Sequence, residues 1–316
     1  MSGYQAVAPG KIILFGEHAV VYGRPAIAVP VSNVQATARL EPATTAGLRL
    51  VAPDLKRDYY LGDDVAPDDA LARIIRLTLA RLGQPAPPDA VLTVTSTIPL
   101  GRGLGSGAAI STAICRVLAQ FYEQTLSPAE VSSLVYEVEK LYHGTPSGID
   151  NTVIAYEQPV YFVKGQPIEP MAAAKPFTLV VGDTGIVAPT HQVVGDLRRR
   201  WEIEPARYEI YFDHIAAIAV QARLLIEQGE TGPELGRLMN ANQALLETVG
   251  VSSPALEQLS AAARQAGALG AKLSGAGWGG NMIALVEPQP DAVGRVTAAL
   301  EVAGATGIIV TEVAPP

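Results

Sequence analysis

The chain has 316 residues, of which 48% are apolar and 17% charged, so it can bury the cores of two ordinary domains and is not a disordered protein. Its net charge of −8 argues against broad binding to nucleic acids or anionic membranes, which need a basic face, but allows an anionic small substrate held by local donors. Cys115 is the only cysteine, which excludes an intramolecular disulfide and a cysteine-rich metal site.

The first third of the chain is predicted to be rich in strands, because short apolar or alternating runs are broken there by glycine and proline. These strands are expected at residues 4–8, 12–15, 26–29, 33–40, 48–51 and 58–61. Helical spacing of apolar residues predicts a helix over 68–82, and residues 90–97 alternate like a strand. A glycine-rich loop at 101–107 then leads into an apolar helix predicted over 108–122.

Helix-start signals organise the rest of the chain. Ser127-Pro128-Ala129-Glu130 has the pattern of a capping box and predicts a helix to about Tyr142. A loop at 143–148 precedes residues 149–156, where Asp150 starts another helix, and residues from about 192 to 267 are predicted to be helical, with a second cap at Ser253-Pro254. The remaining elements are strands at 160–163, 178–181, 271–274, 282–286 and 308–313, and a helix from Asp291.

Both halves mix strands and helices, which predicts an α+β protein rather than a regular βαβ series. Glycine, proline and small residues cluster at 165–176, so we expect an N-terminal domain at 1–168 and a C-terminal domain at 169–316. The N-terminus lacks the pattern of a secretory leader, and no stretch of 18 uncharged apolar residues occurs. Together with the cysteine count, this predicts a cytoplasmic enzyme.

The glycine-rich loop at 101–107 is a candidate phosphate site. Its four glycines lie between a predicted strand and a predicted helix, so backbone N–H groups and the positive helix end can meet an anion. Ser106 can either cap the helix or offer its hydroxyl to Mg²⁺. No Walker A sequence occurs, and Gly103-x-Gly105-x-x-Ala108 imitates a dinucleotide fingerprint only in part, because Glu123 follows a long helix instead of a second strand.

Two further segments carry candidate polar groups. In residues 8–23, Lys11, Glu17 and His18 bracket one apolar strand and can face a polar substrate, although each can also be a solvated or capping side chain. In residues 139–150, Glu139 and Asp150 flank a tight loop. Two carboxylates there suit Mg²⁺ binding and handling of a substrate proton, and the alternative is that Asp150 only caps a helix.

A second glycine-rich turn spans residues 272–281 and joins two predicted strands. It can close over phosphates or be a simple hairpin, and the number of its glycines favours a functional role.

The four segments together resemble the GHMP family of small-molecule kinases, named for its galacto-, homoserine, mevalonate and phosphomevalonate kinases. The three family motifs occur in order and at plausible spacing, and the resemblance covers nearly the whole chain. The segments PGKIILFGEHAVVYG, HGTPSGID and Gly182-Asp183-Thr184-Gly185 are most similar to the mevalonate branch. Many relatives have Ser-Ser where this chain has Ser106-Gly107, which removes one hydroxyl near the phosphates but keeps Ser106.

The resemblance implies a two-domain α+β fold with the active site in the cleft between the domains, and transfer of the ATP γ-phosphate to mevalonate. It makes Asp150 the catalytic acidic residue and Lys11 its basic neighbour, with Ser106 and Glu139 as Mg²⁺ ligands. The ATP phosphates are expected at Pro99, Gly101, Arg102, Gly103, Leu104, Gly105, Ser106, Gly107 and Ala108. The acceptor is expected at Lys11, Glu17, His18, Asp150, Thr184, Gly275 and Ala276. A homodimer is left open.

Three rival hypotheses remain. A sister kinase for phosphomevalonate or a sugar would use extra cations such as Arg198, Arg199 and Arg200, although a basic run on a helix is usually a solvated face. A silent ligand sensor on the same fold would be expected to lose Asp150, Lys11 or Glu139, and all are present. A nicotinamide-dependent oxidoreductase rests on the imperfect fingerprint alone, and a decarboxylase of the same fold fits the GEH sequence less well.

Overall fold

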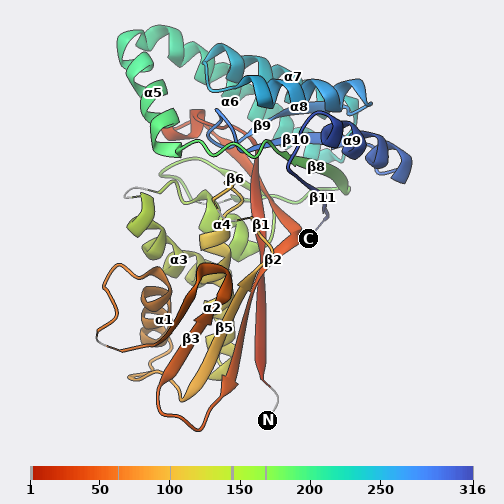
Figure 1. Ribbon diagram of the computed structural model, residues 1–316. Helices are drawn as coiled ribbons and strands as arrows, with labels where there is room; N and C mark the ends of the chain where they lie inside the picture. The colour runs from red at the N-terminus through yellow and green to blue at the C-terminus, as the bar shows by residue number, and fades with distance from the viewer. Residues whose placement is uncertain (1–2, 63, 100, 144–145, 168, 316) are drawn as a thin grey trace. The chain divides into compact units, whose positions relative to one another are not determined.

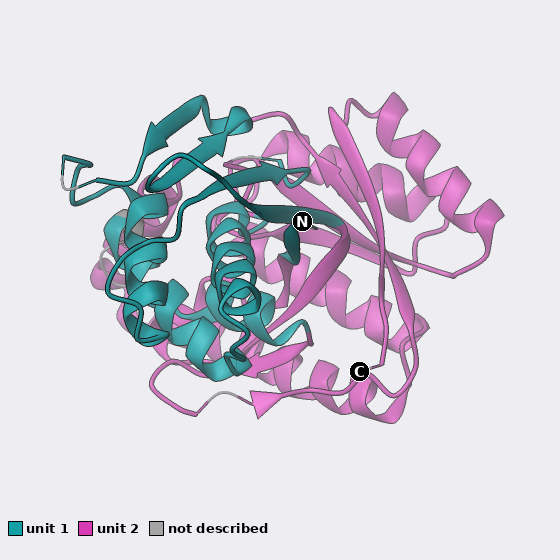
Figure 2. Cartoon of the chain, turned by 90° about the horizontal axis from the view of Figure 1, so that it is seen from below, with its two compact units in different colours: residues 1–10, 34–100, 104–157 teal, residues 11–33, 101–103, 158–316 magenta. Residues whose placement is uncertain are grey.

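The protein is described by a computed structural model that covers residues 3–62, 64–99, 101–143, 146–167 and 169–315. Contacts within the chain define two compact units, which Figure 2 shows in different colours. Unit 1 comprises residues 1–10, 34–100 and 104–157, and unit 2 comprises residues 11–33, 101–103 and 158–316. Each unit is therefore built from several chain segments. The division of the chain into domains at 1–168 and 169–316 stays a prediction.

Unit 1 is a small sheet with helices packed on it (Figure 1). Its strands are the later part of β2 (Ala26–Pro42), β3 (Leu48–Ala52), β4 (Arg57–Tyr60) and β5 (Ala90–Ser96), in the order β4-β3-β5-β2. β3 pairs with β5 in parallel, and the other pairs are antiparallel. α2 (Ser106–Phe121) packs on β5 and is surrounded by α1 (Ala70–Arg81), α3 (Pro128–His143) and α4 (Ile149–Tyr156). The small and apolar residues of α2 allow this deep burial.

Unit 2 contains an antiparallel sheet in the order β11-β8-β10-β9. Its strands are β8 (Phe177–Asp183), β9 (Gly270–Ser274), β10 (Asn281–Val286) and β11 (Gly307–Val313). Five helices of the described chain belong to this unit: α5 (Thr190–Ile203), α6 (Pro205–Gln228), α7 (Pro233–Thr248), α8 (Pro254–Gln265) and α9 (Pro290–Val302). α7 and α8 pack on β9, and α9 packs on β8 and β11. β6 (Val160–Phe162) pairs with β7 (Glu169–Pro170) and with the first residues of β2.

The core of unit 2 lies between this sheet and its helices. Val180, Leu273 and Ala284 from the strands meet Phe212 and Leu259 from the helices, all without appreciable exposure. Tyr22, in the short 3₁₀ helix Ala19–Tyr22, stacks on Phe212 with 4.2 Å between ring centroids. The segment that follows β1 (Tyr4–Phe15) is thereby fixed by aromatic packing.

The predicted elements are largely confirmed, with corrections where proline was expected to break a strand. β1 runs unbroken through Pro9 and Gly10, and β2 runs unbroken through Pro30. β2 pairs with β6 through residues 26–28 and with β5 through residues 36–42. Pro30 lies between these two ladders, so its missing N–H interrupts neither of them.

Helix starts follow the local signals. Ser127 and Glu130 form the predicted capping box, with Ser127 Oγ 2.7 Å and Ser127 N 2.8 Å from Glu130 Oε2. Ser253 Oγ accepts from Leu256 N at 3.5 Å at the start of α8. The proposed capping role of Asp150 is wrong, because Gly148 is the N-cap of α4 and Asp150 lies in its first turn.

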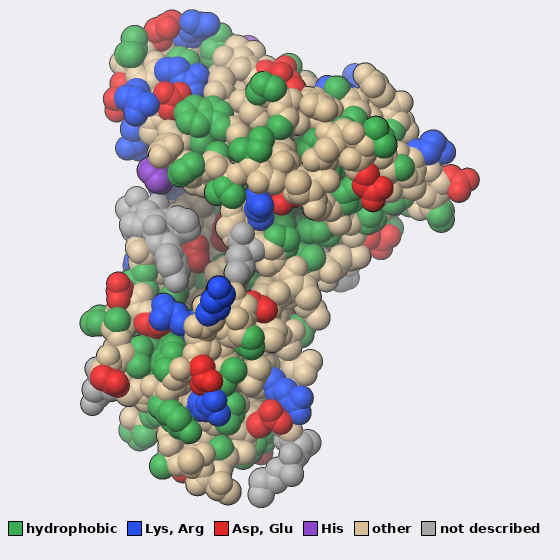
Figure 3. Space-filling view, in the orientation of Figure 1, with side chains coloured by type: hydrophobic (Ala, Val, Ile, Leu, Met, Phe, Trp, Pro, Cys, Tyr) green, Lys and Arg blue, Asp and Glu red, His purple; other side chains and the backbone are tan. Residues whose placement is uncertain are grey.

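Basic and acidic side chains are interspersed over the face of the molecule seen in Figure 3. Among the described residues, no helix combines the length and apolar character that crossing a membrane requires.

Two helical glycines provide a matched test of the packing between α7 and β9. A Cβ at Gly236 in α7 would overlap the backbone of Leu269, whereas a Cβ at Gly294 in α9 would meet nothing within 4 Å. We expect Gly236→Ala to lower the free energy of unfolding by about 2 kcal/mol or more, since overpacking outweighs the gain in helix propensity. Gly294→Ala should raise the free energy of unfolding by about 0.5–1 kcal/mol. Urea unfolding of both variants measures the difference, and equal shifts in the two would contradict the close approach of α7 to β9.

Candidate active site

The glycine-rich loop presents backbone N–H groups at the start of α2. Gly101, Gly103 and Gly105 have φ values of 70°, 75° and 73°, in the left-handed region that favours glycine. Gly105 is the N-cap of α2, and no side chain of the described chain caps the helix there. The proposal that Ser106 caps α2 is therefore wrong, because Ser106 is the first residue within the helix. The uncapped N–H groups and the helix dipole favour an anion at this position.

Glu139 of α3 lies beside this helix end. A Cβ added at Gly107 would lie 3.6 Å from Glu139 Oε1, so the carboxylate reaches the first turn of α2. Glu139 is only 6% exposed, although its side chain is acidic. A buried carboxylate at the first turn of a helix that begins with Ser106 offers an oxygen ligand that suits Mg²⁺, which usually combines one or two carboxylates with substrate phosphates and water.

Asp150 is held in place by its neighbours in α4. Asn151 donates from Nδ2 to Ser132 O and Ser132 Oγ of α3, at 3.1 and 2.8 Å. Thr152 Oγ1 donates to Gly148 O at 2.6 Å. The first turn of α4 is thus fastened to α3, and the half-buried Asp150 has a defined position within unit 1. Of the loop before it, residues 144 and 145 lie outside the described residues.

Glu17 and Lys272 form a fully buried ion pair within unit 2. Lys272 Nζ donates to Glu17 Oε1 and also to Leu273 O at 2.7 Å, and both side chains have 0% exposure. Burial raises the pKa of Glu17 and lowers the pKa of Lys272, and the mutual attraction of the two charges opposes both shifts. The charge of Lys11, which is itself 5% exposed, also lowers the pKa of Glu17.

This pair changes the role expected of Glu17. Its Oε1 is engaged by Lys272, while Oε2 is buried with no hydrogen-bond partner among the described residues. Lys272 was not among the predicted site residues. The signal that could have found it is a single lysine inside the apolar run of residues 270–274.

His18 is a neutral hydrogen-bond donor. Its Nε2 lies 2.8 Å from Ala276 O, which can only accept. Burial lowers the pKa of His18 to about 4, and the charge of Arg200 acts in the same direction. The structure therefore brings together two predicted residues, His18 and Ala276, that lie 258 positions apart in the sequence.

Thr184 is already engaged by its surroundings. Its Oγ1 donates to Gly280 O at 2.9 Å and accepts from Ile186 N at 3.3 Å, and the residue is 9% exposed. These bonds give Thr184 a structural role in holding the second glycine-rich turn, whereas its contact with an acceptor stays a prediction.

The second glycine-rich turn owes two of its glycines to close packing. A Cβ at Gly277 would overlap Val251 O, and one at Gly279 would lie 2.6 Å from Ile186 O. Trp278 donates from its backbone N to Val251 O at 2.9 Å and from Nε1 to Gly250 O at 3.0 Å. The turn does join two antiparallel strands, β9 and β10, as a hairpin would. Gly275, whose φ is 92°, meets nothing within 4 Å of a Cβ position and remains open.

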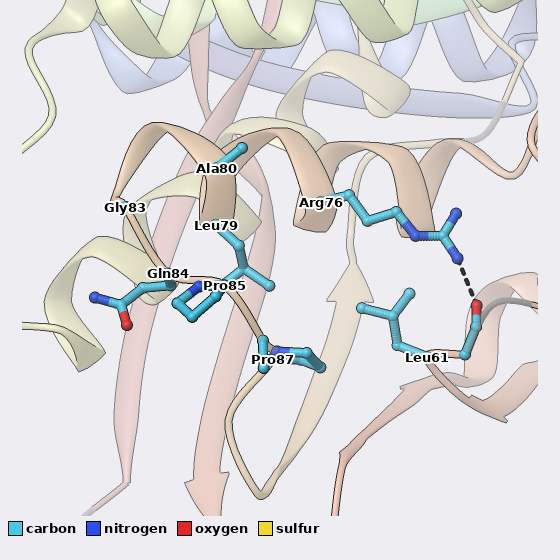
Figure 4. Close-up of a pocket in the computed structure, with 10 residues that line it drawn as sticks. Leu61, Arg76, Leu79, Ala80, Gly83, Gln84, Pro85 and Pro87 are labelled. Carbon is cyan, nitrogen blue, oxygen red and sulfur yellow. Dashed lines mark hydrogen bonds between the residues drawn. The ribbon is translucent and has the colours of Figure 1, made fainter.

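A separate depression of about 560 Å³ in unit 1 contains none of the predicted residues. Figure 4 shows Leu79 of α1 extending toward Pro85, and Arg76 donates to Gly62 O at 2.5 Å at the rim. Within the described ranges, no group of three or more His, Cys, Asp or Glu side chains could hold a metal ion.

Comparisons with known proteins match the chain to one family over both halves. Residues 69–158 match the GHMP kinases N-terminal domain, and residues 222–302 match the GHMP kinases C-terminal domain. Mevalonate kinases of Thermococcus sibiricus and Pyrococcus abyssi are 34% and 35% identical to the chain, covering 96% of it and 94% of their own lengths. The crystal structure of L. major mevalonate kinase in complex with R-mevalonate has a TM-score of 0.84 and 31% identity, covering 98% of this chain and 96% of that one.

The buried ion pair predicts an asymmetric response to mutation. Lys272→Met leaves the Glu17 carboxylate buried without its cation, so we expect a loss of about 3–5 kcal/mol in the free energy of unfolding. The double variant Lys272→Met/Glu17→Gln removes the stranded charge and should recover at least about 1 kcal/mol of that loss. Urea unfolding provides the comparison. A double variant less stable than Lys272→Met alone would show that the pair is not the reason for the lysine.

The depressed pKa of His18 predicts a loss of stability in acid. Between the ordinary value of 6.5 and the folded value of about 4, the unfolded chain binds more protons than the folded one. Stability from this group is therefore complete above pH 6.5 and falls as the pH falls, by about 2 kcal/mol at pH 5.

The variant His18→Asn isolates this contribution, because asparagine tolerates the φ of 60° at this position and does not titrate. Unfolding free energies at pH 7 and pH 5 should differ less in the variant than in the unmodified protein, by about 2 kcal/mol. The same pH dependence in both proteins would refute a neutral, buried His18.

Proposed function

Because this chain belongs to the GHMP kinase family, we propose that it is a mevalonate kinase, which transfers the γ-phosphate of ATP to the 5-hydroxyl of mevalonate. The observation that carries the proposal is the identity of 34–35% with mevalonate kinases over 96% of the chain. The product would be 5-phosphomevalonate. The use of ATP by kinases of this family accords with the phosphate-binding geometry at the start of α2.

In this proposal, Asp150 is the catalytic carboxylate and Lys11 stabilises the alkoxide that forms from the acceptor hydroxyl. The proton can leave to Asp150, or the Lys11 charge can favour the alkoxide sufficiently by itself. Both schemes are consistent with phosphoryl transfer, in which positioning and charge neutralisation supply most of the catalysis. The buried surroundings of Lys11 strengthen its electrostatic effect.

The loop from Gly101 to Ala108, with Pro99, would bind the ATP phosphates through backbone N–H groups. Ser106 and Glu139 would hold Mg²⁺, in accord with the position of the Glu139 carboxylate beside Gly107. The ion would neutralise charge on the β- and γ-phosphates. The acceptor would contact His18, Gly275 and Ala276, with Glu17 and Thr184 supporting that wall through their hydrogen bonds. We also propose a cytoplasmic enzyme with an N-terminal domain at 1–168 and a C-terminal domain at 169–316.

The rival in which Arg198, Arg199 and Arg200 bind a phosphorylated acceptor has little support. Arg200 donates to Val249 O at 2.6 Å and pairs with Asp196 at 2.8 Å. Arg199 pairs with the other Asp196 oxygen at 2.9 Å. Arg199 and Arg200 are thus already paired with Asp196, which makes them less available to a substrate phosphate.

The direct test is ADP release by the purified protein with ATP and Mg²⁺, offered mevalonate, phosphomevalonate and galactose separately. Mevalonate alone should support release. Release with another acceptor would replace the proposed substrate, and silence with bound ATP would favour a ligand sensor.

Asp150 provides the sharpest test of the assigned chemistry. We expect Asp150→Ala and the isosteric Asp150→Asn to lower kcat by about a hundredfold or more, the lower range for loss of an acid–base group. The unfolding midpoint of Asp150→Asn should stay near that of the unmodified protein, because the substitution is isosteric and Asn151 and Thr152 continue to hold the start of α4. Near-normal turnover in either variant would remove Asp150 from the mechanism.

A further inference from the structure

Three residues of the glycine-rich loop belong to a different unit from the rest of it. Residues 101–103 cluster with unit 2, whereas residues 34–100 and 104–157 on either side belong to unit 1. Two contacts account for this. Arg102 Nε lies 3.3 Å from Asp183 Oδ2, and Asn281 Nδ2 donates to Arg102 O at 2.6 Å.

The two anchoring residues form one rigid feature of the unit 2 sheet. Asp183 ends β8 and Asn281 begins β10, and they face each other in the antiparallel register. Asp183 Oδ1 accepts from Gly185 N at 2.8 Å, and Asp183 O accepts from Thr306 N at 2.8 Å. Asn281 is 4% exposed, and the Asp183 side chain is 15% exposed. Both anchoring residues are therefore held by contacts within unit 2 other than those with the loop.

The loop needs an anchor of this kind. Arg102 stands between Gly101 and Gly103, both at positive φ, and a Cβ at either glycine would meet nothing within 4 Å. Glycines without packing partners lose much conformational entropy when they are ordered. A loop that must be ordered by the nucleotide itself binds that nucleotide less tightly than one ordered beforehand.

We propose that Arg102 is a positioning residue, which acts through Asp183 and Asn281 to hold the glycine-rich loop in the conformation that receives the ATP phosphates. The proposal rests on the proposed kinase function. It differs from a direct contact between the guanidinium and a phosphate. The Nε edge of Arg102 already faces a carboxylate, and Nη1 is buried with no partner among the described residues. A direct contact with a phosphate would have to use the other guanidinium nitrogens, of which Nη1 is buried.

The test is a double-mutant cycle in the full chain with Arg102→Met, Asp183→Asn and both changes together. Asp183→Asn keeps an oxygen for Gly185 N–H but replaces the carboxylate that attracts Arg102. The readout is the dissociation constant of ATP with Mg²⁺ by calorimetry, without any acceptor. Because this readout does not depend on turnover, an incorrect acceptor assignment leaves the test intact.

We expect each single variant to weaken ATP binding by about fivefold. The double variant should bind ATP no more weakly than the single variant that binds it less tightly, because all three variants break the same contact. A direct phosphate contact gives the opposite sign for one variant. Asp183→Asn would then free Arg102 and leave ATP binding unchanged or tighter, with independent effects in the double variant. That outcome would overturn the proposal.

Two further measurements separate positioning from general destabilisation. Hydrogen exchange without nucleotide should be faster over residues 101–107 in Asp183→Asn and unchanged over α6. With mevalonate as acceptor, KM for ATP should rise while KM for mevalonate stays within about twofold. The control is Asp213→Asn, which weakens the pair between Arg24 and Asp213 of α6 in the same unit. This variant should leave ATP binding unchanged. An unchanged exchange rate over 101–107 in Asp183→Asn would also refute the anchor.

Discussion

The arrangement of unit 2 around the candidate site depends on one constraint, which is that a buried charge must have a partner. Glu17 and Lys272 are both fully buried, and neither could remain charged there alone. Their pairing ties the turn after β1 to β9, over 255 positions of sequence. The turn must also bend sharply, with Gly16 at a φ of 91° and His18 at 60°. His18 also bonds to Ala276, so the ion pair and this hydrogen bond together fix residues 16–18 against the second glycine-rich turn. The buried pairing with Lys272 is therefore sufficient to explain the carboxylate of Glu17, without a contact to a substrate.

The glycines of the motifs serve two different physical needs. Gly101, Gly103 and Gly105 take positive φ values next to the start of α2, where backbone N–H groups favour binding of an anion. Gly277 and Gly279 instead allow the backbones of Val251 and Ile186 to approach closely. The second glycine-rich turn is thus closely packed, with Trp278 bonded to Gly250 O and Thr184 bonded to Gly280 O. Glycine content alone predicts both kinds of turn equally well, and only the neighbours of each Cβ position distinguish them.

The sequence was sufficient where the signal was local. The capping box at Ser127, the buried helix after the glycine-rich loop and the α+β composition all follow from neighbouring residues, and the structure has them. Prediction failed where a distant partner decides. Pro30 does not break β2, because the neighbouring strands β6 and β5 pair with residues 26–28 and 36–42 of β2 and not with Pro30. Lys272 was not singled out, because its partner Glu17 lies at the other end of the chain. The engagement of Arg102 by Asp183 and of Thr184 by Gly280 likewise arises only when β8 and β10 lie side by side.

An overall charge of −8 is compatible with the anionic acceptor of the proposed function, because a bound anion responds mainly to the charges beside it and not to the total. His18 contributes no charge at neutral pH, since burial lowers its pKa to about 4. The charge of Lys272 is matched by that of Glu17, which it contacts directly. Lys11 is a further buried cation in this unit, 5% exposed, and its charge lowers the pKa of Glu17, so Lys11 and Lys272 act on the same carboxylate. In the proposed mechanism, the low exposure of Lys11 would limit the screening of its charge by water, so a buried ammonium would favour an alkoxide more than an exposed lysine would.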